Sequence, residues 1–135
     1  MSDIYLVDDH ALMRDGLRVV LEHGGHRVVG ESGDVDQAQA DIPRLTPAVV
    51  LVDLSLDHRS GLELLEQLPT RTPFTRYIVL TMLAQPGHVV EALRLGASGY
   101  VLKGSPAAEV LNAVAQVCQG RRYLGPGCRN WRTGR

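Results

Sequence analysis

The run Ala48-Val49-Val50-Leu51-Val52-Asp53 places five consecutive apolar residues directly before a carboxylate. A short, β-branched apolar run without alternation is typical of a strand buried on both faces, as in the centre of a parallel sheet. A charge inside such a core costs free energy, so we expect Asp53 to emerge at the carboxyl end of the strand. Open α/β sheets bind their ligands at that edge, which makes Asp53 the first candidate site residue.

The rest of the chain alternates apolar runs with amphipathic segments. Strands are predicted at residues 4–7, 27–31, 48–53, 77–80 and 98–102. Helices are predicted at residues 11–23, 34–43, 60–68, 86–95 and 106–118. Asp34 has the spacing of a helix N-cap, and residues 69–73 are predicted to form a turn between two prolines. Strict alternation of strands and helices predicts a parallel sheet that helices cover on both faces.

Length and composition indicate an ordinary globular domain. The chain has 135 residues, of which 44% are hydrophobic and 21% charged. It has no apolar run long enough to span a bilayer and does not begin with a signal-like segment, so the expected location is the cytoplasm. Cys118 and Cys128 lack metal-like spacing and are expected to remain reduced thiols.

Charge is distributed unevenly along the sequence. The net charge is only −1, but every acidic residue lies before Val110 and the last fifteen residues carry several arginines. An acidic body argues against direct binding of nucleic acid by residues 1–120. We interpret residues 121–135, rich in Gly and Arg, as a linker or disordered tail rather than a second domain.

Polar side chains follow four of the five predicted strands. Asp8 and Asp9 follow the first strand, Asp53 ends the third, Thr81 follows the fourth and Lys103 follows the fifth. Because the carboxyl ends of parallel strands meet at one edge, these side chains can share one site. Clustered carboxylates repel one another, and Mg²⁺ with oxygen ligands relieves that repulsion. A hydroxyl and an ammonium opposite the metal would hold an anion, so the pattern predicts phosphoryl transfer.

Lys103 is the only lysine in a chain with thirteen arginines. A compact, flexible ammonium suits a phosphoryl oxygen in a small site better than a planar guanidinium. We therefore interpret Lys103 as a functional residue.

Several motifs resemble the receiver domain of two-component response regulators, in particular the NarL/FixJ-type, LuxR-like subfamily. The similarity runs from about residue 4 to residue 124. It rests on Leu6-Val7-Asp8-Asp9-His10, Leu12-Met13-Arg14-Asp15-Gly16-Leu17, Gly61-Leu62-Glu63-Leu64-Leu65, Leu80-Thr81-Met82, Gly96-Ala97-Ser98-Gly99-Tyr100-Val101-Leu102-Lys103 and Gly120-Arg121-Arg122-Tyr123-Leu124. The resemblance implies a flavodoxin-like (βα)5 doubly wound sheet with strand order 2-1-3-4-5.

The resemblance also implies the roles of the acidic residues. Asp53 would be the phosphoacceptor, whose carboxylate attacks the phosphohistidine of a sensor kinase and becomes an acyl phosphate. Asp9 and Asp53 would bind Mg²⁺ directly, Asp8 would hold it largely through water, and the backbone carbonyl of Ser55 would be a further ligand. The domain would catalyse only its own phosphorylation and dephosphorylation and would not be an enzyme acting on an external substrate.

Switching roles follow from the same resemblance. Lys103 would pair with one phosphoryl oxygen and Thr81 would donate its hydroxyl to another. Tyr100 would turn inward as Thr81 moves. The surface that changes would be the fourth helix, fifth strand and fifth helix, at about residues 87–95, 97–102 and 106–120.

The implied partners are a sensor histidine kinase and a second copy of the chain, bound through the fourth helix, fifth strand and fifth helix or through the first and fifth helices. DNA would be bound only through a helix-turn-helix domain, which the sequence lacks, and no membrane is implied. The sequence leaves open whether the chain is a fragment of a transcription regulator or a free-standing receiver. Residues 120–124 resemble the start of an interdomain linker, which favours the fragment.

The sequence departs from the receiver pattern at two loop positions. Asp57 stands where receivers usually have proline, four residues after the acceptor, which adds a carboxylate near the metal. Leu83 has no polar group to position a hydrolytic water, so we expect slow autodephosphorylation.

His10 lies beside the predicted site and is a candidate for tuning it, whereas the other histidines show no ligand spacing.

Two alternative functions remain. A phosphatase of the haloacid dehalogenase type also uses an Asp nucleophile and Mg²⁺, but it expects D-x-D after the first strand, where this chain has adjacent Asp8 and Asp9. A receiver-like module that signals without phosphate usually lacks part of the acidic set or the lysine, and this sequence keeps both.

Overall fold

The computed structural model describes residues 2–56, 58–82 and 85–128. Its main sheet has six strands in the order β2-β1-β3-β6-β7-β8, and every pairing in it is parallel. The strands are β1 (Asp3–Val7), β2 (Arg27–Ser32), β3 (Val49–Val52), β6 (Arg76–Thr81), β7 (Gly99–Leu102) and β8 (Tyr123–Leu124). Two further strands, β4 (Ser55–Leu56) and β5 (Arg59–Ser60), form a small antiparallel pair after β3.

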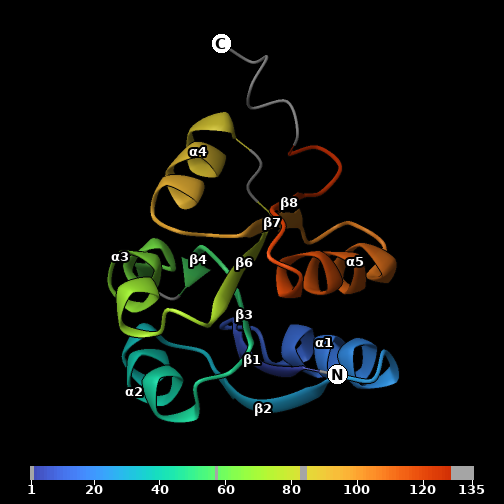
Figure 1. Ribbon diagram of the computed structural model, residues 1–135, viewed down its shortest axis with the longest axis horizontal. Coiled ribbons are helices and arrows are strands. Elements are labelled where there is room, and N and C mark those ends of the chain that lie inside the picture. The colour runs from blue at the N-terminus through green and yellow to red at the C-terminus, as the bar shows by residue number, and fades with distance from the viewer. Residues whose placement is uncertain (1, 57, 83–84, 129–135) are drawn as a thin grey trace.

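Five helices alternate with the strands and cover both faces of the sheet. They are α1 (Ala11–His23), α2 (Val35–Leu45), α3 (Leu62–Arg71), α4 (Pro86–Arg94) and α5 (Ala107–Cys118). Helices α1 and α5 lie on one face, and α2, α3 and α4 lie on the other (Figure 1). Since β6 and β7 are the predicted fourth and fifth strands, the expected order 2-1-3-4-5 is confirmed, as is the doubly wound α/β fold.

Strand β3 lies between β1 and β6 and is buried along its whole length. Its side chains alternate between two apolar cores. Val50 and Val52 pack towards α2, α3 and α4, whereas Val49 and Leu51 pack towards α1 and α5. Burial on both sides explains why this strand is apolar at every position.

Strand β8 extends the sheet beyond the boundary expected at residue 120. Gly120 adopts a left-handed φ of 80°, which glycine tolerates, and the chain then turns back alongside β7. Tyr123 and Leu124 pair with Gly99 and Tyr100, and the Gly125 N–H donates to the Tyr100 carbonyl at 2.9 Å. Part of the segment predicted as linker therefore belongs to the folded sheet, because β7 would otherwise expose unpaired backbone groups at its edge.

Two helices continue past prolines at which the sequence predicted an end or a turn. Pro43 lies inside α2 and Pro69 lies inside α3, although proline removes a helical hydrogen bond. The residues before them, Ile42 and Leu68, are fully buried, and their packing outweighs that loss. The predicted cap at the start of α2 is confirmed, since the Asp34 carboxylate accepts the Gln37 backbone N–H at 2.7 Å.

Among the described residues, no helix is both long enough and apolar enough to cross a membrane.

Candidate phosphoacceptor site

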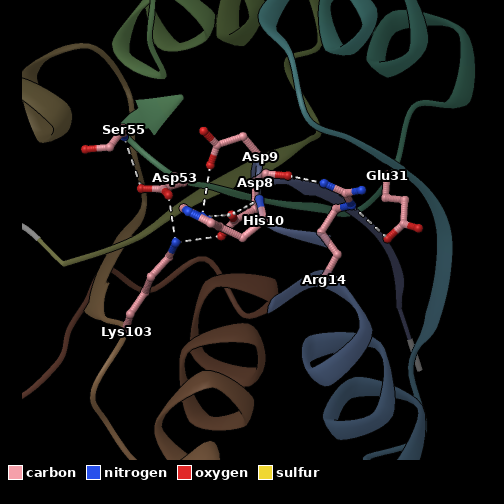
Figure 2. A network of polar contacts seen from close by, with 8 residues as sticks. All are labelled: Asp8, Asp9, His10, Arg14, Glu31, Asp53, Ser55 and Lys103. Carbon is pink, nitrogen blue, oxygen red and sulfur yellow. Dashed lines mark hydrogen bonds and ion pairs between the residues drawn. The ribbon is translucent and has the colours of Figure 1, made fainter. Parts of the chain in front are cut away.

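The predicted site residues lie together at the carboxyl ends of the strands. Asp8 and Asp9 follow β1, Asp53 follows β3, Thr81 ends β6 and Lys103 follows β7. Figure 2 shows that the acidic side chains and Lys103 point towards one another across this edge. The structure therefore brings Asp8, Asp9, Asp53 and Lys103 together, and it places Thr81 at the end of the neighbouring strand β6.

Asp53 is a buried carboxylate, with only 3% of the residue exposed. One of its oxygens, Oδ1, accepts the Ser55 backbone N–H at 3.1 Å, and Oδ2 accepts the Lys103 ammonium at 2.7 Å. Donors from two different segments therefore fix the orientation of the Asp53 carboxylate.

Lys103 joins two carboxylates, since its Nζ also lies 2.7 Å from Asp8 Oδ2. Burial alone would lower the pKa of Lys103, but its hydrogen bonds to Asp53 and Asp8 outweigh that effect and raise this pKa above its usual value. The ammonium consequently stays protonated and supplies a fixed positive charge at the site.

Asp8 is the most fully occupied of the three carboxylates. While its Oδ2 binds Lys103, its Oδ1 accepts the His10 backbone N–H at 2.9 Å. Arg14 donates to the Asp8 backbone carbonyl and approaches Glu31, with its Nε 3.4 Å from Oε2. Both carboxylate oxygens and the backbone carbonyl of Asp8 thus have partners within the protein.

Asp9 has a carboxylate oxygen that accepts no hydrogen bond from the described residues. Its Oδ1 is buried yet forms no hydrogen bond in the described structure. Ligand atoms of Asp8, Asp9, His10 and Asp53 all lie within 4.8 Å of one another. Three carboxylates against one ammonium leave two negative charges uncompensated, and a hard divalent cation would neutralise them. The donor set therefore fits Mg²⁺.

Thr81 and Tyr100 are both fully buried. In the register of β6 and β7, Thr81 pairs with Leu102 and Val79 pairs with Tyr100. Since side chains two residues apart share one face of a strand, Thr81 and Tyr100 lie diagonally on the same face of the sheet. Burial raises the pKa of the Tyr100 phenol, which stays protonated and retains its O–H donor.

Two site features were not recognised as such from sequence. Arg14 was quoted only as part of a motif. It lies in the first turns of α1, six residues after Asp8, and that position is the signal that could have indicated contact with the site. Gly61 precedes α3 and lies against the backbone of Asp53, so closely that a Cβ there would collide with the Asp53 carbonyl oxygen. Asp57, expected to add a carboxylate near the metal, and Leu83, expected to slow autodephosphorylation, lie outside the described residues.

This fold, with acidic residues at the carboxyl edge of a five-stranded parallel core, is that of a CheY-like receiver. A CheY-like receiver domain protein from Methanospirillum hungatei JF-1 superposes with a TM-score of 0.82 and 25% identity, covering 89% of this chain and 95% of that one. The family model for the response regulator receiver domain matches residues 4–115. The chain belongs to this family of two-component signalling switches.

Several of the similar proteins are response regulators of the NarL/FixJ and LuxR type. The chain is 38% identical to the DNA-binding transcriptional activator DevR/DosR of Mycobacterium tuberculosis over 92% of its own length and 58% of that protein. It is 34% identical to the response regulator UvrY of Escherichia coli K12 over 92% of its length and 57% of UvrY. A LuxR-family response regulator from Aurantimonas sp. SI85-9A1 superposes with a TM-score of 0.91 and 33% identity, with 96% and 94% of the two chains covered.

The chain thus spans less than two thirds of the length of these curated relatives.

Proposed function

We propose that this chain is the phosphoacceptor receiver of a two-component response regulator, with Asp53 as the residue that is phosphorylated. The observation that carries this proposal is the position of the Asp53 carboxylate, buried at a strand end and hydrogen-bonded to Lys103 at 2.7 Å. A buried carboxylate beside a fixed cation and an open acidic oxygen is suited to attack a phosphorus whose oxygens need neutralising.

In the proposed reaction, an Asp53 oxygen attacks the phosphorus of a phosphohistidine on a sensor histidine kinase. The P–O bond to Asp53 forms as the P–N bond breaks, and the released imidazole nitrogen takes up a proton. Bound Mg²⁺, held by Asp9, Asp53 and the Ser55 carbonyl with Asp8 acting through water, would neutralise charge on the transferring group. The protein mainly positions the two reactants and stabilises charge.

Lys103 and Thr81 would stabilise the phosphorylated state. The Lys103 ammonium, which now joins Asp8 and Asp53, would exchange one carboxylate for a phosphoryl oxygen. The Thr81 hydroxyl would donate to another phosphoryl oxygen, and Tyr100, on the same face of the sheet, would repack in response.

The proposed output surface is formed by α4, β7 and α5. Phosphorylation shifts an equilibrium between two states only by as much as the phosphoryl group favours one of them.

The chain would act as the receiver part of a DNA-binding transcription regulator, as the name of its DevR/DosR relative suggests. In that role the chain after β8 would lead from the receiver to the output domain. The solved relative RcsB, 27% identical in sequence, binds DNA as dimers, which supports a homodimer of this chain through the α4–β7–α5 surface or through α1 and α5.

Intact mass after incubation with acetyl phosphate and Mg²⁺ tests the assignment. We expect one phosphoryl adduct on the wild type and on Asp15→Asn, a control at an exposed position of α1, and none on Asp53→Asn. An adduct that persists on Asp53→Asn would overturn the assignment of Asp53. Absence of an adduct from every variant would favour a module that signals without phosphate.

A further inference from the structure

The acidic cluster contains a nitrogen donor that an ordinary magnesium site does not require. His10 Nδ1 lies 3.2 Å from Asp8 Oδ1 and 3.0 Å from Asp9 Oδ1. The imidazole stands between the two carboxylates at the mouth of the site (Figure 2). Its side chain is 70% exposed, so no packed core holds it there.

His10 Nδ1 is hydrogen-bonded to Asp8 Oδ1, whereas its contact with Asp9 is not a hydrogen bond. Although Nδ1 and Oδ1 are 3.0 Å apart, Asp9 Oδ1 accepts no hydrogen bond in the described structure. Two neighbouring ligands of an octahedral cation with bonds of about 2.1 Å lie about 3.0 Å apart. The spacing of the two atoms is that of an ion pair when the imidazole is protonated, and it equally suits two ligands of one metal ion.

The chemistry of the donors determines which ion such a set prefers. Mg²⁺ favours oxygen ligands and retains its waters, whereas imidazole nitrogen favours Zn²⁺, Co²⁺ and the other borderline transition-metal ions. A metal ion would replace the hydrogen bond between Nδ1 and Asp8 Oδ1 by binding the Nδ1 lone pair, while the ring proton stays on Nε2. Replacing one water by that nitrogen would strengthen binding of a transition-metal ion far more than binding of Mg²⁺.

We propose that His10 ligates the metal through Nδ1 alongside Asp9 and Asp53, and that the site therefore selects borderline transition-metal ions such as Co²⁺ and Zn²⁺ relative to Mg²⁺. This inference rests on the metal site of the proposed function and adds the residue that sets its selectivity.

Titration calorimetry with Co²⁺ and Mg²⁺ measures that selectivity on the wild type, His10→Gln and His23→Gln. His23 is an exposed histidine at the end of the same helix, which makes it a matched control for adventitious binding. We expect the ratio of Co²⁺ to Mg²⁺ affinity to fall about tenfold or more in His10→Gln and to stay unchanged in His23→Gln. An unchanged ratio in His10→Gln would overturn the proposal.

Pulsed electron paramagnetic resonance of bound Mn²⁺ reports the ligand directly. We expect coupling to an imidazole ¹⁴N in the wild type and in His23→Gln, displaced by excess Mg²⁺ and missing from His10→Gln. Wild-type Mn²⁺ without nitrogen coupling would refute ligation by His10.

The two proposals fail in different ways. If the wild type forms the Asp53 adduct but shows no nitrogen coupling, only the role of His10 falls. If Asp53→Asn still forms the adduct, the proposed function falls whatever the nitrogen signal shows.

Discussion

The Lys103 ammonium lies 2.7 Å from Oδ2 of Asp53 and 2.7 Å from Oδ2 of Asp8, so a single buried cation holds two carboxylates that would otherwise repel each other. The two aspartates come from different strands, and the lysine comes from a third. This one contact ties the ends of β1, β3 and β7 together. The stability of the folded domain therefore depends on the positive charge of Lys103 beside the two carboxylates.

Replacing Lys103 by methionine should destabilise the folded protein, because two buried carboxylates would lose their cation. We expect the free energy of unfolding to fall by about 3 kcal/mol without Mg²⁺. Added Mg²⁺ should recover part of that loss, since it binds the folded state. Urea unfolding with and without Mg²⁺ measures both effects. An equal loss in Arg76→Met, at an exposed cation on β6, would contradict this explanation.

Replacing Gly61 by alanine should disturb the phosphoacceptor itself. The added Cβ would meet the Asp53 carbonyl oxygen and lie 3.0 Å from Val52 Cγ2, so the backbone at the end of β3 must shift. We expect a loss of about 1–3 kcal/mol in stability and slower labelling of Asp53 by acetyl phosphate.

The control for Gly61 is Gly16→Ala in α1, where a Cβ meets nothing within 4 Å. Alanine is the better helix former, so this variant should gain up to about 1 kcal/mol. Similar stability and labelling in the two variants would argue against the close approach of Gly61 to Asp53.

Stability should fall as pH decreases because of His26. Burial lowers the pKa of this imidazole, and its Nδ1 accepts the Ser2 backbone N–H at 3.2 Å, which requires an unprotonated nitrogen. The unfolded chain therefore binds a proton near pH 6.5 that the folded chain resists. The contribution of neutral His26 is present above about pH 6.5 and is lost as pH falls below it.

Urea unfolding one pH unit above and one below about 6.5 measures this effect. The dependence on pH should be weaker in His26→Gln than in the wild type and should be retained in His23→Gln. A His26→Gln profile parallel to that of the wild type would show that another group is responsible.

The two cysteines should differ strongly in reactivity. Cys118 is exposed at the end of α5, whereas Cys128 is only 2% exposed and packs in the same apolar core as Tyr100. We expect a thiol reagent such as Ellman's reagent to modify Cys118 rapidly. Cys128 should react only when the segment after β8 opens away from β7.

Kinetics of the Cys118→Ser variant isolate the slower thiol. Rapid modification of Cys128 in the folded Cys118→Ser protein would contradict the packing of this segment against β7.

The strands were predictable because burial on both faces leaves a local mark. Residues 48–53 form an apolar run that ends in Asp53, and the structure places β3 there, with one residue fewer at each end. Convergence of Asp8, Asp53 and Lys103 was likewise predictable, since parallel strands end at a common edge. The family motifs and the isolated lysine pointed to the same site.

Other features were decided by contacts between residues far apart in the sequence. Helix α3 continues past Pro69 because Leu68 is buried, a gain that no local propensity records. Strand β8 forms because β7 offers an edge, although residues 123–124 carry no strand pattern of their own.

By itself the sequence determined the alternating α/β fold and the set of charged residues at the strand ends, because these depend on local apolar patterns and on one general rule of parallel sheets. The strand order came from the resemblance of its motifs to receiver domains. Only the tertiary structure decided that Lys103 joins Asp8 to Asp53, that Gly61 closes on Asp53 and that His10 faces Asp9 at ligand spacing. Those contacts depend on the directions of side chains and on approaches of a few ångströms between separate segments, which no periodicity in the chain encodes.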